Sequence, residues 1–214
     1  SREQPNMLVI PFCDLKSGDT EAQGINTTLA DNMNWKQHGC EKNIWSFTAQ
    51  FRRSFIDMEF PKDSGFTVDY HFEIAAGAFA AVGDSLEVAI ERPWLYEVAL
   101  NGRPLRFGKH EQWFDEDIRK TSIADAIRSG RNTLRLTARP MHPLCEIMPV
   151  YVLGEFGLKA APVGFTIVKP QPLKLGSWLK QGMPFYAGKV SHRYTFTLDR
   201  PAERLAVSLP DWEG

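Results

Sequence analysis

The sequence contains few of the residues and motifs that mark common catalytic or metal sites. Its three cysteines, Cys13, Cys40 and Cys145, are odd in number and widely spaced, so they fit neither a disulfide framework nor a zinc site. The five histidines are far apart and lack paired metal-ligand spacing. The chain has no G-x-S-x-G nucleophile motif and no glycine-rich phosphate loop. We therefore expect no cofactor and no bound metal ion.

The chain also lacks an excess of charge of one sign and any long apolar run. It carries 25 Lys and Arg against 26 Asp and Glu, a formal net charge of −1. This balance gives no electrostatic reason to expect a nucleic acid or an anionic membrane surface as partner. No apolar run approaches the ~20 residues that a membrane-spanning helix needs. We expect neither a nucleic-acid partner nor a membrane partner.

The sequence is rich, by contrast, in aromatic residues and in alternating apolar and polar positions. Aromatics make up 12% of the chain, with 14 Phe and 6 Trp, which suits both β-rich cores and sugar-binding surfaces. The clearest alternation lies at 67–74, where Val68, Tyr70, Phe72 and Ile74 share one face. Four consecutive matches to a period of two indicate a half-buried strand.

Similar runs recur along the chain at a spacing of roughly 8–12 residues, with turn residues between them. The tight-turn pair Asn101-Gly102 follows one of them. Helical patterns are short and occur around Thr28–His38 and at 121–130. We predict an all-β protein, an antiparallel β-sandwich with a few short helical turns. The further runs expected to form strands are 7–12, 47–51, 86–90, 96–100, 134–138, 150–153, 165–168, 193–198 and 205–209.

The pattern divides the chain into four parts. Residues 1–46 are an N-terminal segment expected to wrap against the sandwich at 47–160, and the proline-punctuated stretch 161–172 is expected to be a linker. Residues 173–214 look like the opening strands of a second, truncated sandwich, so we expect a fragment of a longer protein. So few strands cannot bury an apolar face alone. We expect this part to dock on the first sandwich or to self-associate with a neighbouring molecule.

Three stretches resemble the galactose-binding-like jelly-roll domains of large bacterial glycoside hydrolases, of the β-galactosidase and α-L-rhamnosidase-like kinds. The first combines V-A-L-N-G at 98–102, W-F-D at 113–115 and the run I-A-D-A-I-R-S-G-R-N-T-L at 123–134. The second is E-I-M-P-V-Y-V-L-G-E-F at 146–156, with Glu where these domains more usually have Asp. The third, L-G-S-W-L-K-Q-G-M-P-F-Y-A-G at 175–188, is similar to the opening of the next jelly roll in the same enzymes.

The resemblance implies a non-catalytic accessory module, structural or carbohydrate-binding, attached to the catalytic domain of a glycoside hydrolase. It also implies an exported parent protein. Independently of the resemblance, we expect Asp125 to satisfy backbone donors at the start of the 121–130 turn and Gly130 to end it. Such structural roles identify a fold rather than an active site. Two alternatives stay open: a free-standing carbohydrate-binding or adhesion module, and glycosidase activity within the fragment itself.

Five residues are the candidates for a ligand site. Trp94, Tyr96 and Trp113 could stack on the flat C–H face of a pyranose. His110 and Asp115 lie near Trp113 in the sequence and could join the same surface. The simpler alternative is that the aromatic rings fill the sandwich core and that Asp115 is a solvated turn carboxylate.

No residue emerges as catalytic. Glycoside hydrolysis needs two carboxyl groups flanking the scissile bond. The chain offers Asp115-Glu116-Asp117, Glu111, Glu146 and Glu155, but the simpler interpretation is that these cap turns or face solvent. His71 lies on the polar face of its predicted strand, so we expect it to be exposed. We therefore expect the fragment alone to hydrolyse no glycoside.

Overall fold

The alternation at 67–74 is reproduced in strand β4 (Phe66–Ile74), whose apolar side chains are buried in every second position. Strand β10 (Gly130–Ala138) pairs with it antiparallel along its whole length. Burying each large apolar side chain contributes about 1.5–3 kcal/mol, so this pair forms a strong centre for the core. The computed structural model describes residues 1–46, 53–200, 204–206 and 208.

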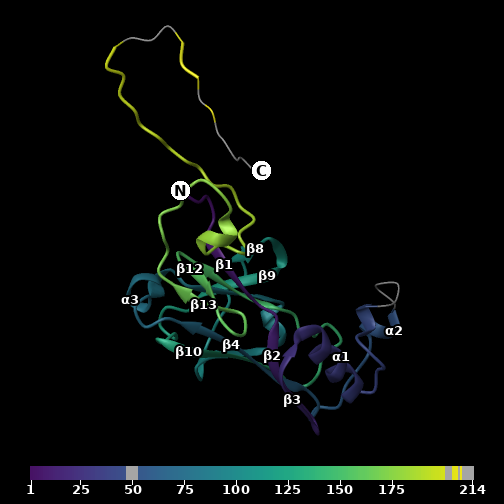
Figure 1. The fold of residues 1–214 in the computed structure, drawn as a ribbon. Helices are drawn as coiled ribbons and strands as arrows, with labels where there is room; N and C mark the ends of the chain where they lie inside the picture. Colours follow the sequence, from purple (N-terminus) through teal and green to yellow (C-terminus); the bar gives the residue numbers. More distant parts are fainter. Residues whose placement is uncertain (47–52, 201–203, 207, 209–214) are drawn as a thin grey trace.

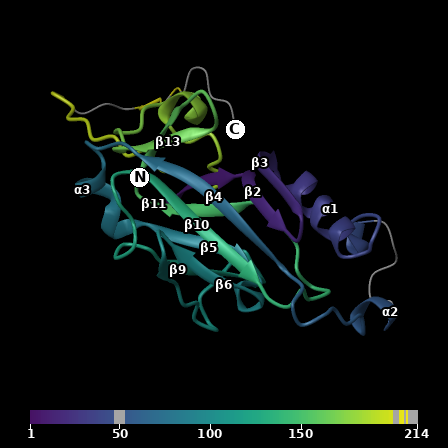
Figure 2. The same cartoon turned by 90° about the horizontal axis from the view of Figure 1, so that it is seen from below.

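Two sheets pack face to face around the core, which confirms the predicted β-sandwich (Figures 1 and 2). The smaller sheet has the order β1 (Asn6–Ile10), β11 (Val150–Gly154), β5 (Glu87–Glu91), β9 (Asp115–Ser122), β8 (Gln112–Trp113). The larger sheet runs β12 (Gly157–Ala160), β13 (Phe165–Val168), β4, β10, β6 (Glu97–Leu100), β7 (Arg103–Pro104), with β2 (Phe12–Ser17) and β3 (Thr20–Asn26) attached beside β4.

The N-terminal segment supplies three of these strands rather than only wrapping around them. β1 forms an edge of the smaller sheet by pairing with β11, as its apolar run predicts. After Pro11 the chain crosses to the larger sheet, where β2 pairs with β4 and with β3. β13, inside the predicted linker, also belongs to the larger sheet: it pairs antiparallel with β12 and parallel with the end of β4.

Helices are short, as expected. α1 (Thr27–Gln37) matches the predicted helix, and the Asn26 side chain caps it by accepting a hydrogen bond from the Thr28 amide at 2.9 Å. α1 packs beside β2 and β3 (Figure 2). The remaining turns of helix are α2 (Arg53–Ile56), α3 (Phe79–Val82), η1 (Ile44–Ser46), η2 (Gly83–Ser85), η3 (Pro93–Leu95) and η4 (Trp178–Gln181). The strand expected at 47–51 lies outside the described residues. No helix in the described part of the chain is long and apolar enough to cross a membrane.

The predicted helical turn at 121–130 is shorter than expected. Its first two residues end β9, and one turn follows, in which the Ala126 and Ile127 amides donate to the Ile123 carbonyl at 2.9 and 3.1 Å. The Asp125 carboxylate lies 3.8 Å from the Arg103 guanidinium and is 86% exposed. The fully buried Asn132 organises the turn instead: its side-chain oxygen accepts from the Arg128 amide at 2.9 Å, and its amide group donates to the Arg128 carbonyl at 2.8 Å and the Gly130 carbonyl at 3.0 Å.

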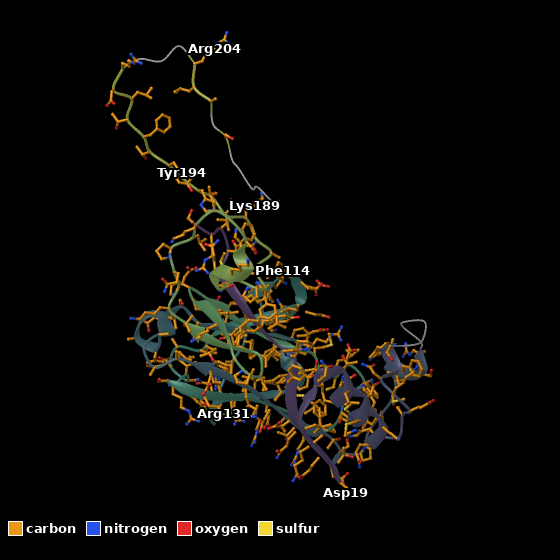
Figure 3. The ribbon with its side chains drawn as sticks, in the orientation of Figure 1. Asp19, Phe114, Arg131, Lys189, Tyr194 and Arg204 are labelled. Atoms are coloured by element: carbon orange, nitrogen blue, oxygen red, sulfur yellow. The ribbon has the colours of Figure 1, made fainter. Side chains whose placement is uncertain are left out.

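The C-terminal part behaves in two ways. Around η4 it docks on the sandwich, since the Gly182 carbonyl accepts hydrogen bonds from the Leu158 amide and the Asn6 side chain, both at 2.9 Å. The following stretch extends away from the body (Figures 1 and 3). Residues 193–198 form no strand, and their side chains on the predicted apolar face, Tyr194, Phe196 and Leu198, are exposed. The predicted docking therefore applies to the η4 region and not to 193–198; of 205–209, the structure describes only 205, 206 and 208.

Candidate functional site

The strongest candidate site is a groove beside Trp94, between η3, the loop after β7, and β9. Its volume is about 640 Å³. Trp94 lies on η3 and is 55% exposed, which is unusual for so large an apolar side chain. Pro93 begins this turn and Arg92 precedes it in the left-handed region, φ 46°, so the backbone directs Trp94 outward at a fixed place.

Arg119 from β9 packs against the Trp94 ring. Its guanidinium carbon lies 5.6 Å from the ring centroid, within the range of a cation–π interaction. The Nη1 of Arg119 donates to the Lys109 carbonyl at 2.5 Å, and the Lys120 amide donates to the Glu111 carbonyl at 2.9 Å. These bonds fix the loop 105–111 against β9. Val98 of β6 in the larger sheet and Arg119 of β9 in the smaller sheet both line the groove, so each sheet contributes to it.

A group of charged side chains behind η3 holds Arg92. Its Nε donates to the Asp117 carboxylate at 2.9 Å and its Nη1 to the Glu146 carboxylate at 3.3 Å. Glu91 lies 3.7 Å from the same guanidinium. Burial raises the pKa of Glu91, with the Arg92 charge opposing the rise. These carboxylates bind the Arg92 guanidinium and so hold the residue that precedes η3 in place. They are not presented to a ligand.

Asn43 extends this group to helix α1. Its side-chain amide donates to Asp31 at 2.6 Å and to Glu146 at 2.9 Å, and the other Asp31 oxygen accepts from the Ile147 amide at 2.9 Å. Burial raises the pKa of Asp31 to about 6, although these hydrogen bonds act to lower it. Asp31 thus ties α1 to the segment before β11 with a carboxylate that ionises reluctantly.

The structure separates the five predicted site residues. Trp94 and Tyr96 line the groove. Tyr96 is also structural: its hydroxyl donates to the Glu146 carbonyl at 3.0 Å, and burial raises its pKa well above the ordinary value. His110 is exposed on the loop 105–111 and is not among the described residues that line the groove.

Trp113 and Asp115 lie elsewhere, at the turn between β8 and β9. The Trp113 ring packs on Tyr151, 5.1 Å between centroids, and on Phe114, 4.4 Å. Tyr151 alternates with the buried Val150 and Val152, so these rings cover the outer face of the smaller sheet. Asp115 accepts a hydrogen bond from the Asp117 amide at 2.8 Å and shapes the turn. Asp115 is thus a turn carboxylate, whereas Trp113 lies on the outer face of the smaller sheet and not in the sandwich core.

A second cluster was not predicted. His71 Nε2 lies 2.8 Å from an Asp14 oxygen, and its Nδ1 lies 3.1 Å from the Thr133 hydroxyl. His71 is only partly exposed, contrary to expectation, because β2 runs beside β4 and brings Asp14 to it. The alternation of the buried Cys13, Leu15 and Ser17 could have indicated β2. A groove of about 600 Å³ adjoins His71, and Cys13, Asp14 and Glu73 also line it, whereas Thr133 is not among the described lining residues.

The other candidate chemistries find little support in the side chains. Among the described residues, no group of three or more His, Cys, Asp or Glu side chains could hold a metal ion. Burial raises the pKa of Cys13 to about 12 and that of Cys145 to about 11, so neither thiol is a ready nucleophile.

Comparison with known proteins adds no assignment. No model of a known protein family matches the chain, and no curated protein matches it.

Proposed function

We propose that the chain is a non-catalytic module, of the galactose-binding-like kind, that binds carbohydrate in the Trp94 groove and serves a glycoside hydrolase. The observation that carries the proposal is the half-exposed Trp94 ring held in place beside a cavity of about 640 Å³. An exposed, immobilised indole offers a flat apolar surface to a pyranose and loses little conformational freedom on binding.

The hydrogen-bonding groups around the ring suit the same ligand. Arg119 has five N–H donors, of which one bonds to the Lys109 carbonyl, and the exposed Arg106 and Lys109 add further donors. Sugars need such donors around an apolar platform, because each hydroxyl must keep its hydrogen bonds when it leaves water. The groove offers both.

Binding is tested by affinity electrophoresis of the chain through gels containing a panel of neutral and acidic polysaccharides. We expect retardation by at least one polysaccharide and at least a tenfold loss of affinity in Trp94→Ala, since the stacking surface is removed. Phe114→Ala is the matched control, because Phe114 is 74% exposed but lies outside the described groove lining. Equal loss in both variants, or no retardation by any polysaccharide, would refute the proposal.

The non-catalytic part of the proposal has its own test. The carboxylates of Asp117 and Glu146 behind η3 are bound to Arg92, and Asp115 shapes a turn. We expect no turnover of a panel of aryl glycosides by the purified chain. Turnover that is abolished by Glu116→Gln or Asp115→Asn would show instead that the chain is itself a glycosidase.

A further inference from the structure

The groove has a positive charge that binding of a neutral carbohydrate does not require. Three basic side chains, Arg106, Lys109 and Arg119, are among its lining residues, whereas no Asp or Glu is among the described residues that line it. The chain as a whole carries a net charge of −1, so this excess of positive charge is local. Like charges gathered without carboxylates repel one another, and an anion between them would relieve that repulsion.

Among the described residues, the three cations have no carboxylate partner either. No ion pair involving Arg106, Lys109 or Arg119 occurs in the part of the chain that the structure describes. Arg92, close by in the sequence, shows the contrast, because it faces three carboxylates. Glu111 lies on the same loop as Lys109, but its side chain packs beside Gly108 and does not line the groove.

We infer that the ligand of the Trp94 groove is an acidic carbohydrate, a sugar carrying carboxylate or sulfate groups. This inference rests on the proposed function. Trp94 contacts the apolar face of a pyranose ring, while Arg119 at the indole and Arg106 and Lys109 on the loop 105–111 bind the anionic groups. Guanidinium and ammonium groups form charge-assisted hydrogen bonds with carboxylate and sulfate oxygens, and these are stronger than bonds to neutral hydroxyls.

The experiment compares glycans that differ only in charge. Affinity electrophoresis of the full chain uses polygalacturonate against its methyl ester, and dextran sulfate against dextran, with galactan as a further neutral polysaccharide. We expect retardation by at least one acidic glycan and at least tenfold weaker retardation by its neutral counterpart. The polygalacturonate and dextran sulfate arms distinguish carboxylate from sulfate as the recognised group. Retardation falls as salt is raised to about 1 M, where charges are screened beyond about 3 Å.

Variants that remove one positive charge test whether the groove causes the preference for acidic glycans. Arg106 and Lys109 are exposed, so replacing them leaves the core intact. We expect Arg106→Gln and Lys109→Gln each to weaken binding of the acidic glycan about three- to tenfold. Lys159→Gln is the matched control, because Lys159 is exposed on β12 and is not among the described residues lining the groove. Equal weakening by all three variants would mean non-specific attraction and would refute the inference.

The remaining outcomes distinguish the inference of an acidic ligand from the proposal that the groove binds carbohydrate. If neutral glycans are retarded as strongly as their acidic counterparts and Trp94→Ala abolishes the effect, carbohydrate binding stands and acidity is refuted. If no glycan is retarded, both are refuted. A single-stranded oligonucleotide that binds more tightly than either acidic glycan, with loss of binding in Arg106→Gln, would overturn the inference by assigning the groove to nucleic acid.

Discussion

Replacing Asp31 with Asn should remove a penalty that the folded protein incurs as pH rises. Burial raises the pKa of Asp31 to about 6, against about 3.9 for a free aspartate. A group whose pKa is higher in the folded than in the unfolded state stabilises the folded protein while it is protonated. This contribution to the unfolding free energy is lost as pH rises through the pKa of the folded state. The difference of about two units corresponds to about 3 kcal/mol of unfolding free energy, lost between about pH 4 and pH 7.

The assay is urea unfolding of the wild type and of Asp31→Asn at several pH values. We expect the unfolding free energy of the variant minus that of the wild type to rise by about 3 kcal/mol from about pH 4 to pH 7. Taking this difference cancels the titration of groups common to both proteins. Among these are Glu91, whose pKa burial raises, and Asp14, whose pKa is lowered by His71 and Gly24 hydrogen bonds despite burial.

Asp19→Asn is the control, because Asp19 is an exposed aspartate at the tip of the β2–β3 hairpin (Figure 3). A rise for Asp19→Asn as large as that for Asp31→Asn would point to a general effect of replacing an aspartate and not to the burial of Asp31. A flat difference for Asp31→Asn, within about 1 kcal/mol, would refute the argument, because it would mean that Asp31 ionises as easily in the folded as in the unfolded chain.

Three further outcomes follow from the buried groups. Cys40, the least buried thiol, should react with a thiol reagent in the native protein, whereas Cys13 and Cys145 should react only after unfolding; equal native reactivity of all three would contradict this. Asn132→Ala should lower the unfolding free energy by about 3 kcal/mol, because several buried hydrogen bonds are lost together; a loss below about 1 kcal/mol in urea unfolding would show that the turn does not depend on it. Tyr70→Phe should cost about 1–2 kcal/mol in the same assay, because the Met148 carbonyl loses its 2.7 Å hydrogen bond; an unchanged midpoint would argue against that bond.

The fold was predictable wherever a strand has a polar face and an apolar face. β4 shows this, because its buried and half-buried positions alternate as the sequence does. The same signal misleads at 193–198, where the apolar alternation is present but no strand pairs with it. A strand forms only when a partner supplies its hydrogen bonds and covers its apolar face, and no such partner is visible in a local pattern.

The candidate site was predictable only in part. Trp94 could be proposed from its residue type, since large aromatics are the usual sugar platforms. Arg106 and Lys109 could not be assigned to the same site as Arg119, because they lie on a loop after β7 while Arg119 lies on β9. Only the pairing of strands brings them together. Trp113 was proposed from its residue type too, and no local pattern indicates that its ring packs on Tyr151.

The most direct test of the central claim is the indole N–H resonance of Trp94 in a nitrogen–proton NMR spectrum during titration with an oligosaccharide of the glycan that retards the chain. The chain has six tryptophans, so six indole resonances are expected, and Trp94→Ala identifies one of them. We predict that the Trp94 resonance shifts in a saturable manner while that of Trp113, which packs on Tyr151, stays in place. A saturable shift at Trp113 with none at Trp94 would contradict the account.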